Sequence, residues 1–150
     1  MNKQWIRELT ALPEQQVIDL AARLSEGWQV MSRSLPQSGL GMLKLRDGAF
    51  HDAFYLGEFP LSQAHISLCT RQGQSVEGAA SLMTDKLALV EALAVCDAIL
   101  QHRLEGVDEL IQAVEQGREL VEEQQRIRNA MLQRTRVDFS LLSSTDEDDE

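Results

Sequence analysis

Residues 87–100, LALVEALAVCDAIL, form the longest largely apolar stretch in the chain. Leu89, Leu93, Cys96 and Leu100 repeat at the spacing of one helical face, and smaller residues between them widen the stripe. So broad a stripe predicts a helix that is the most buried element of the fold. Two acidic residues interrupt the stretch, and it is shorter than the roughly 18 residues of a membrane span.

The preceding residues favour short strands joined by turns. Ala64, Ile66 and Leu68 alternate with more polar neighbours, as in a strand with one buried face. The connections are too short for parallel crossovers, which need a dozen or more residues, so antiparallel pairing is expected. The predicted strands lie at 30–35, 43–45, 54–56, 64–69 and 76–83, with turns at 36–39, 47–48 and 72–75.

Helices are expected on both sides of the strands. Pro13 and Gly27 bracket an N-terminal helix, preceded by a shorter one, and Thr84 or Asp85 is a candidate cap for the central helix. After Gly106 a second C-terminal helix begins, and its apolar stripe thins beyond residue 121. Such a helix either leans on another chain or projects into solvent. We therefore predict an α+β fold: an antiparallel sheet of about four to five strands, N-terminal helices and a long C-terminal helical pair.

Length and charge narrow the function classes. The chain has 150 residues, with 14 Lys+Arg against 24 Asp+Glu, and its last five residues are all acidic. We expect one domain over residues 1–142 and a disordered acidic tail at 143–150. The acidic balance argues against nucleic-acid binding. Two cysteines, and a start without a signal-peptide pattern, lead us to expect a cytoplasmic protein with free thiols and no membrane association.

No group of residues forms a recognisable catalytic, cofactor or metal site. His65 and Cys69 are four apart in a predicted strand, about 13 Å, which one metal ion cannot bridge. Gly39-Leu40-Gly41 lacks the third glycine of a dinucleotide fingerprint and is interpreted as a turn. Asp97, within the apolar stretch, is expected at the exposed edge of the stripe or paired with an arginine.

The C-terminal residues are the candidate partner interface. Beyond the last helix, Val137, Phe139 and Leu141 alternate with polar residues, so a short strand there must pair with something or remain loose. The arginines at 126, 128, 134 and 136 are either the solvated side of a helix or part of an interface. The predicted docking arm near 134–142 comprises Arg134, Arg136, Val137, Asp138, Phe139 and Leu141.

The order of elements resembles the G subunit family of the bacterial carbon–phosphorus lyase system, which breaks down phosphonates. Four stretches, within roughly residues 20–142, carry the resemblance. Where the family has an aromatic residue and a second glycine before the central helix, this chain has Ala79 and Thr84. The matching stretches are Ala22-Arg23-Leu24, Phe54-Tyr55-Leu56-Gly57-Glu58 with the strand that follows, Gly78 with Thr84-Asp85-Lys86 and the central helix, and Arg136-Val137-Asp138-Phe139.

The resemblance implies an accessory role beside H, I and J subunits. That system transfers an alkylphosphonate to the ribose of ATP with loss of adenine, and later breaks the C–P bond. ATP, S-adenosylmethionine and an iron–sulfur cluster would then belong to other subunits, with no cofactor in this chain. We further expect the arm to dock on the I subunit. The alternative from another class is a small acidic secretion-type chaperone, a homodimer that holds an extended client segment.

Overall fold

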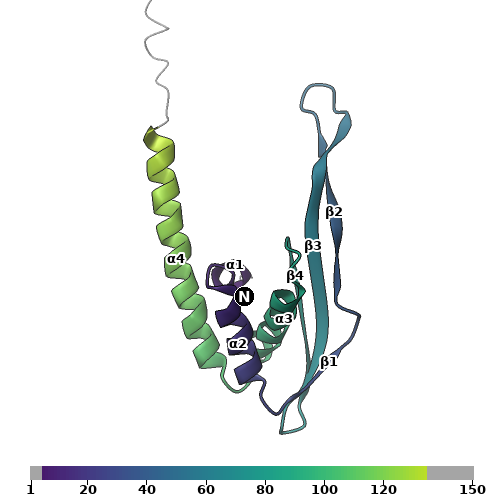
Figure 1. Cartoon of the computed structure of the whole chain (residues 1–150), viewed down its shortest axis with the longest axis vertical. Coiled ribbons are helices and arrows are strands. Elements are labelled where there is room, and N and C mark those ends of the chain that lie inside the picture. The colour runs from purple at the N-terminus through teal and green to yellow at the C-terminus, as the bar shows by residue number, and fades with distance from the viewer. Residues whose placement is uncertain (1–4, 135–150) are drawn as a thin grey trace, which may run out of the picture.

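The computed structural model describes residues 5–134, in which the helices lie on one side of a four-stranded antiparallel sheet (Figure 1). The predicted α+β class, with N-terminal helices and a C-terminal helical pair, is confirmed. The elements are α1 (Trp5–Leu9), α2 (Glu14–Leu24), β1 (Gln29–Ser32), β2 (Gln37–Arg46), β3 (Ala53–Cys69), β4 (Ser75–Leu82), α3 (Leu87–His102) and α4 (Val107–Arg134).

β3 is the central strand, and its two halves have different neighbours. Its C-terminal half pairs with β4 on one edge, over Ser62–Cys69, and with β1 on the other. Its N-terminal half pairs with β2 over residues 53–63, and over residues 53–61 β2 is its only partner among residues 5–134. The sheet therefore narrows to a two-stranded ribbon. The predictions of separate strands at 54–56 and 64–69 were wrong, because these residues belong to the continuous strand β3. The predicted turn at 36–39 was wrong as well, because β2 begins at Gln37.

Pro60 is tolerated inside β3 because of the edge that it faces. The N–H of Arg33 donates to the carbonyl of His65 at 2.9 Å, so odd-numbered residues near the end of β3 bond toward β1 and β2. Even-numbered residues then face β4, whose last pair is Ser62 with Leu82. The nitrogen of Pro60 points past the end of β4, where its missing N–H interrupts no ladder.

α3 forms the centre of the core, as its apolar stripe predicts. Leu93 and Cys96 are fully buried and Leu89 nearly so. Gly78 of β4 lets the backbone of α3 come close, because a Cβ there would lie 2.2 Å from the carbonyl oxygen of Ala94. The predicted helix cap was wrong. The Thr84 hydroxyl accepts the N–H of Lys86 at 3.2 Å, in a turn just before the helix.

Asp97 closes one edge of the sheet. Its Oδ2 accepts the N–H of Ala79 at 3.0 Å and the side-chain amide of Gln101 at 2.6 Å, and the residue is buried. The expectation of an exposed or arginine-paired Asp97 was therefore wrong. Because Ala79 lies on β4 with its N–H directed away from β3, the carboxylate satisfies a donor that no strand reaches.

Among residues 5–134, the buried residues of α4 all lie in its first half. Leu110, Ala113 and Val114 are buried, and Arg118 pairs with Glu8 of α1 at 3.2 Å. At Gly117 a Cβ would lie 1.9 Å from the carbonyl oxygen of Glu8, so the two helices pack with their backbones nearly touching. Beyond this contact α4 runs on away from the other helices (Figure 1). None of the helices between residues 5 and 134 combines the length and apolar character of a membrane span.

Candidate partner-binding surfaces

The distal ribbon, residues 40–60, extends beyond the helices in the same direction as the free half of α4, its residues beyond Arg118 (Figure 1). Its apolar side chains are exposed, with Phe50 at the tip 82% accessible and Leu40 71%. A projecting element in water is normally polar, so this surface is suited to burial against another molecule. The exposed apolar residues are Leu40, Met42, Leu43, Leu45, Phe50, Phe54, Tyr55 and Leu56.

Both faces of the distal ribbon carry apolar groups. Leu45 lies opposite Phe54 on one face, and Lys44 opposite Tyr55 on the other. An antiparallel sheet with a single covered face would present polar residues on its second face. A two-stranded ribbon is also marginally stable in water by itself. Apolar side chains on both faces of the ribbon are what an element buried on both faces by other molecules would show.

The ribbon is nevertheless ordered internally. The Asp47 carboxylate accepts the N–H groups of Ala49 at 3.1 Å and Phe50 at 2.7 Å, which fixes the turn and places Phe50 at the tip. The Lys44 ammonium lies 5.9 Å from the centre of the Tyr55 ring, a cation–π contact. These local interactions hold the exposed side chains in a defined arrangement.

The free half of α4 carries the second apolar surface. Leu120, Ile127 and Met131 are exposed and recur at intervals of seven and four, along one side of the helix. Gly117, packed on α1, precedes Leu120 by three residues on the same side. The side of α4 that packs against α1 therefore continues along the helix as an exposed apolar strip.

Of the predicted docking arm, the described residues include Arg134 alone. Arg134 is the last residue of α4 and is exposed. Arg136, Val137, Asp138, Phe139 and Leu141, and the predicted acidic tail at 143–150, lie outside the described residues. The sequence did not single out the distal ribbon as a candidate surface, because its large apolar residues between Leu40 and Leu56 resemble those of a core strand.

A third feature lies on the sheet face opposite the helices. Glu77 accepts hydrogen bonds from the Arg33 guanidinium, at 2.9 and 2.5 Å, and its second oxygen lies 3.2 Å from the His65 Nε2. The hydrogen bonds from Arg33, and next from His65, lower the pKa of the Glu77 carboxyl. The group is exposed, and its three charged or polar members satisfy one another.

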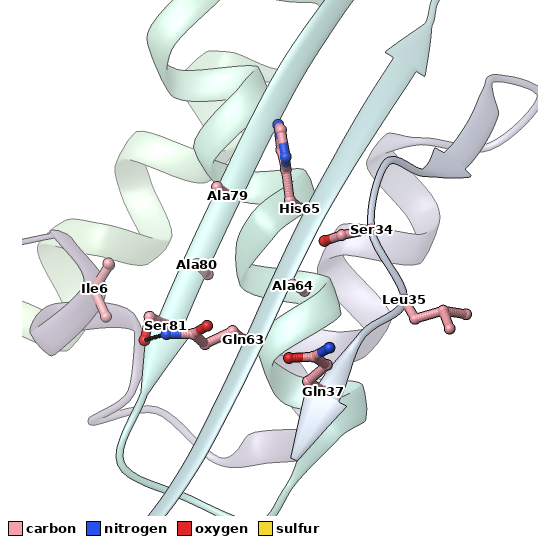
Figure 2. Close-up of a pocket in the computed structure, with 10 residues that line it drawn as sticks. All are labelled: Ile6, Ser34, Leu35, Gln37, Gln63, Ala64, His65, Ala79, Ala80 and Ser81. Carbon is pink, nitrogen blue, oxygen red and sulfur yellow. Dashed lines mark hydrogen bonds between the residues drawn. The ribbon is translucent and has the colours of Figure 1, made fainter. Parts of the chain in front are cut away.

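A shallow cavity of about 540 Å³ lies beside this group (Figure 2). Figure 2 shows the Gln63 side chain reaching toward Ser81 of β4, with Gln37 on the other side of β3 near Ala64 and His65 at one end. The Gln63 amide donates to Ser81 at 3.4 Å. The lining combines neutral polar groups with alanines, and it assembles neither a nucleophile with a base nor a cluster of charges.

The buried polar groups in residues 5–134 serve the fold. Ser62 donates to the carbonyl of Thr84 at 2.8 Å, and Asp97 bonds to β4 as described above. Burial raises the pKa of the Cys96 thiol to about 12, so it is unreactive at neutral pH. No three His, Cys, Asp or Glu residues of this part of the chain could share a metal ion. Gly39 and Gly41 lie within β2, so their interpretation as a turn was wrong.

Comparison with known proteins gives one result for almost the whole chain. A family model described as "Phosphonate metabolism protein PhnG" matches residues 1–143. No curated protein matches the chain. The matched range includes the distal ribbon, all of α4 and the predicted docking arm.

Proposed function

Because this chain belongs to the PhnG family of phosphonate metabolism proteins, we propose that it is an accessory, non-catalytic subunit of a carbon–phosphorus lyase complex. In this role it supports the transfer of an alkylphosphonate to the ribose of ATP with loss of adenine. The observation that carries the proposal is the pair of exposed apolar surfaces, on the distal ribbon and on the free half of α4.

These surfaces support an assembly role on physical grounds. Each large apolar side chain that a partner covers contributes roughly 1.5–3 kcal/mol to association, before the cost of ordering is subtracted. Both surfaces extend from the same body in the same direction (Figure 1), so one assembly can engage the two together. The proposed partners are the H, I and J subunits, with the I subunit receiving the C-terminal arm.

The chemistry is assigned to those partners. Residues 5–134 hold no cluster of nucleophile, base and anion-stabilising groups, and their buried polar side chains are engaged in structural hydrogen bonds. In this proposal ATP, S-adenosylmethionine and the iron–sulfur cluster belong to other subunits of a cytoplasmic complex. Family membership favours this role over that of a secretion-type chaperone.

Co-purification tests the assembly role. The tagged chain is co-expressed with the H, I and J subunits, and the subunits that it retains are quantified. We expect Phe50→Ser, at the ribbon tip, to reduce their recovery. Leu35→Ser is the matched control, because Leu35 is equally exposed at 82% but lies on the body. Equal recovery with both variants would exclude the ribbon tip as a contact.

Two further arms test the remaining parts of the proposal. Phe139→Ala should weaken assembly, whereas removal of residues 146–150 should leave it intact. The purified chain alone, incubated with ATP and methylphosphonate, should release no adenine. Adenine release above a no-enzyme control, abolished by a point mutation in this chain, would overturn the non-catalytic assignment.

A further inference from the structure

β2 pairs with β3 along its length, and among residues 5–134 no strand covers its other edge. We propose that this edge binds an extended segment of a partner polypeptide, which adds a further antiparallel strand to the sheet. The inference rests on the proposed assembly role and specifies how one contact is made. Main-chain hydrogen bonds would supply affinity, and alternate side chains would supply specificity.

The alternation of β2 identifies the groups that are available. Before the register shift, odd-numbered residues of β3 bond toward β2, as the bond from Arg33 to His65 indicates, and they pair with odd-numbered residues of β2, such as Gly41 with Phe59. Beyond the shift the parity changes in β3 but not in β2: Leu45 pairs with Phe54, and the N–H of Asp47 donates to the carbonyl of Asp52 at 2.9 Å. The even-numbered residues of β2 therefore direct their N–H and C=O groups outward. These residues are Ser38, Leu40, Met42, Lys44 and Arg46.

The opposite edge of the ribbon is protected in ways that β2 is not. There β3 carries Pro60, which has no N–H, and the register shift opposite Leu43 and Lys44, which interrupts regular pairing. Prolines and bulges are devices by which natural sheets block edge pairing. β2 has no proline, and its lysine lies over the Tyr55 ring. The edge of β2 is thus the accessible one.

Charge complementarity specifies the partner. The side chains of the outward-bonding residues share one face, with Leu40 and Met42 followed by Lys44 and Arg46. Neither cation has a carboxylate partner within the described part of the chain. An added antiparallel strand would satisfy this face with two acidic residues followed by two apolar ones, each two positions apart. A second copy does not fit, because residues 37–46 contain no acid.

A synthetic peptide of this pattern tests the proposal on the full chain. The probe is fluorescein-labelled Ser-Glu-Thr-Glu-Thr-Val-Thr-Val-Ser, and its control carries Lys in place of both Glu residues. We expect fluorescence anisotropy to show binding of the acidic peptide only. Met42→Pro removes one outward N–H without breaking the pairing to β3, and should weaken binding about tenfold relative to Met42→Ala.

Lys44→Glu provides an independent arm in case the proline variant does not fold. It should shift preference from the acidic to the basic peptide. Unchanged binding in both Met42→Pro and Lys44→Glu would overturn the proposal. A homodimer that Met42→Pro dissociates would also overturn it, because a second copy would then occupy the edge.

Co-purification separates this inference from the assembly role on which it rests. Loss of partner subunits with Met42→Pro but not with Met42→Ala would support the inference. If both variants retain the H, I and J subunits, the edge is not used, although the assembly role stands. If the wild-type chain retains none of these subunits, the assembly role itself fails, whatever the peptide shows.

Discussion

β3 and α4 each have one half packed in the core and one half that projects from it: β3 into the distal ribbon, and α4 into its free half. In β3, Ile66 and Leu68 are buried beneath α3, whereas Phe54 and Tyr55 of the same strand are exposed. In α4, Leu110 is buried and Ile127 is exposed. The residue types hardly differ between the halves; what differs is whether another element of the chain covers them. Apolar content alone therefore does not determine whether a side chain is buried in the fold; the position of the elements that cover it does.

The strongest test of this comparison replaces one leucine in each region. Leu93→Ala in α3 should lower the free energy of unfolding by about 2–5 kcal/mol, because it leaves a cavity among fully buried side chains. Leu40→Ala in the distal ribbon should change it by less than about 0.5 kcal/mol in the isolated chain. Urea denaturation of the two variants measures both effects. Similar losses in the two variants would mean that the ribbon is already covered.

The next effect tests backbone contact in the body. Gly78→Ala places a Cβ against the main chain of α3, which cannot give way without moving the helix, so we expect a loss of about 1–3 kcal/mol. Gly39→Ala in β2 is the control, since a Cβ there meets no atom within 4 Å. Thermal unfolding compares them. A Gly78→Ala protein as stable as wild type would show that α3 and β4 pack less tightly than described.

The third prediction concerns the closed edge of the sheet. Asp97→Ala leaves the N–H of Ala79 without its partner and should cost about 1–3 kcal/mol. Asp97→Asn keeps a side-chain oxygen in place and should cost less. Hydrogen exchange at Ala79 adds a local measurement, since exchange should accelerate in the alanine variant. Equal stability and exchange in wild type and Asp97→Ala would remove the assigned role.

The smallest predicted effect is a pH-dependent change in stability at Glu77, on the exposed face of the sheet. The pKa of Glu77 is lowered in the folded chain, chiefly by Arg33, so its contribution to stability is present above its ordinary value of 4.5. That contribution is lost as pH falls through the folded pKa. Glu77→Gln should therefore slightly destabilise the chain at pH 7 and have less effect near pH 3. An effect that grows toward acid would contradict this sign.

The helices could be predicted from the sequence because their signals are local. Leu89, Leu93 and Cys96 repeat at one spacing, and that spacing alone identifies the buried face of α3. The continuity of β3 through Gly57 and Pro60 could not be predicted, because glycine and proline normally end strands. Pro60 is harmless only because β4 stops two residues short of it, which is a fact of tertiary structure. Asp97 was misjudged for the same reason, since its partner is a main-chain donor 18 residues away.

The candidate interface shows the same limit. The thinning stripe of α4 after Val121 led to the prediction that part of this helix leans on another chain or projects into solvent. In the structure that part is exposed, which agrees with either alternative. The distal ribbon was not identified, because short apolar strands in a sequence are indistinguishable from strands of the core. Only the position of α3, which covers one half of β3 and not the other, separates them.

The hydrogen bond between Asp97 and Ala79 also limits how copies of this protein can stack. Growth of a filament through sheet edges requires two open edges on every molecule, one to receive a strand and one to offer it. Here a carboxylate from the chain's own helix occupies the middle of the β4 edge. A strand added at Ala79 would therefore have to displace the Asp97 carboxylate. The buried acid thus disfavours repeated stacking of copies through the β4 edge.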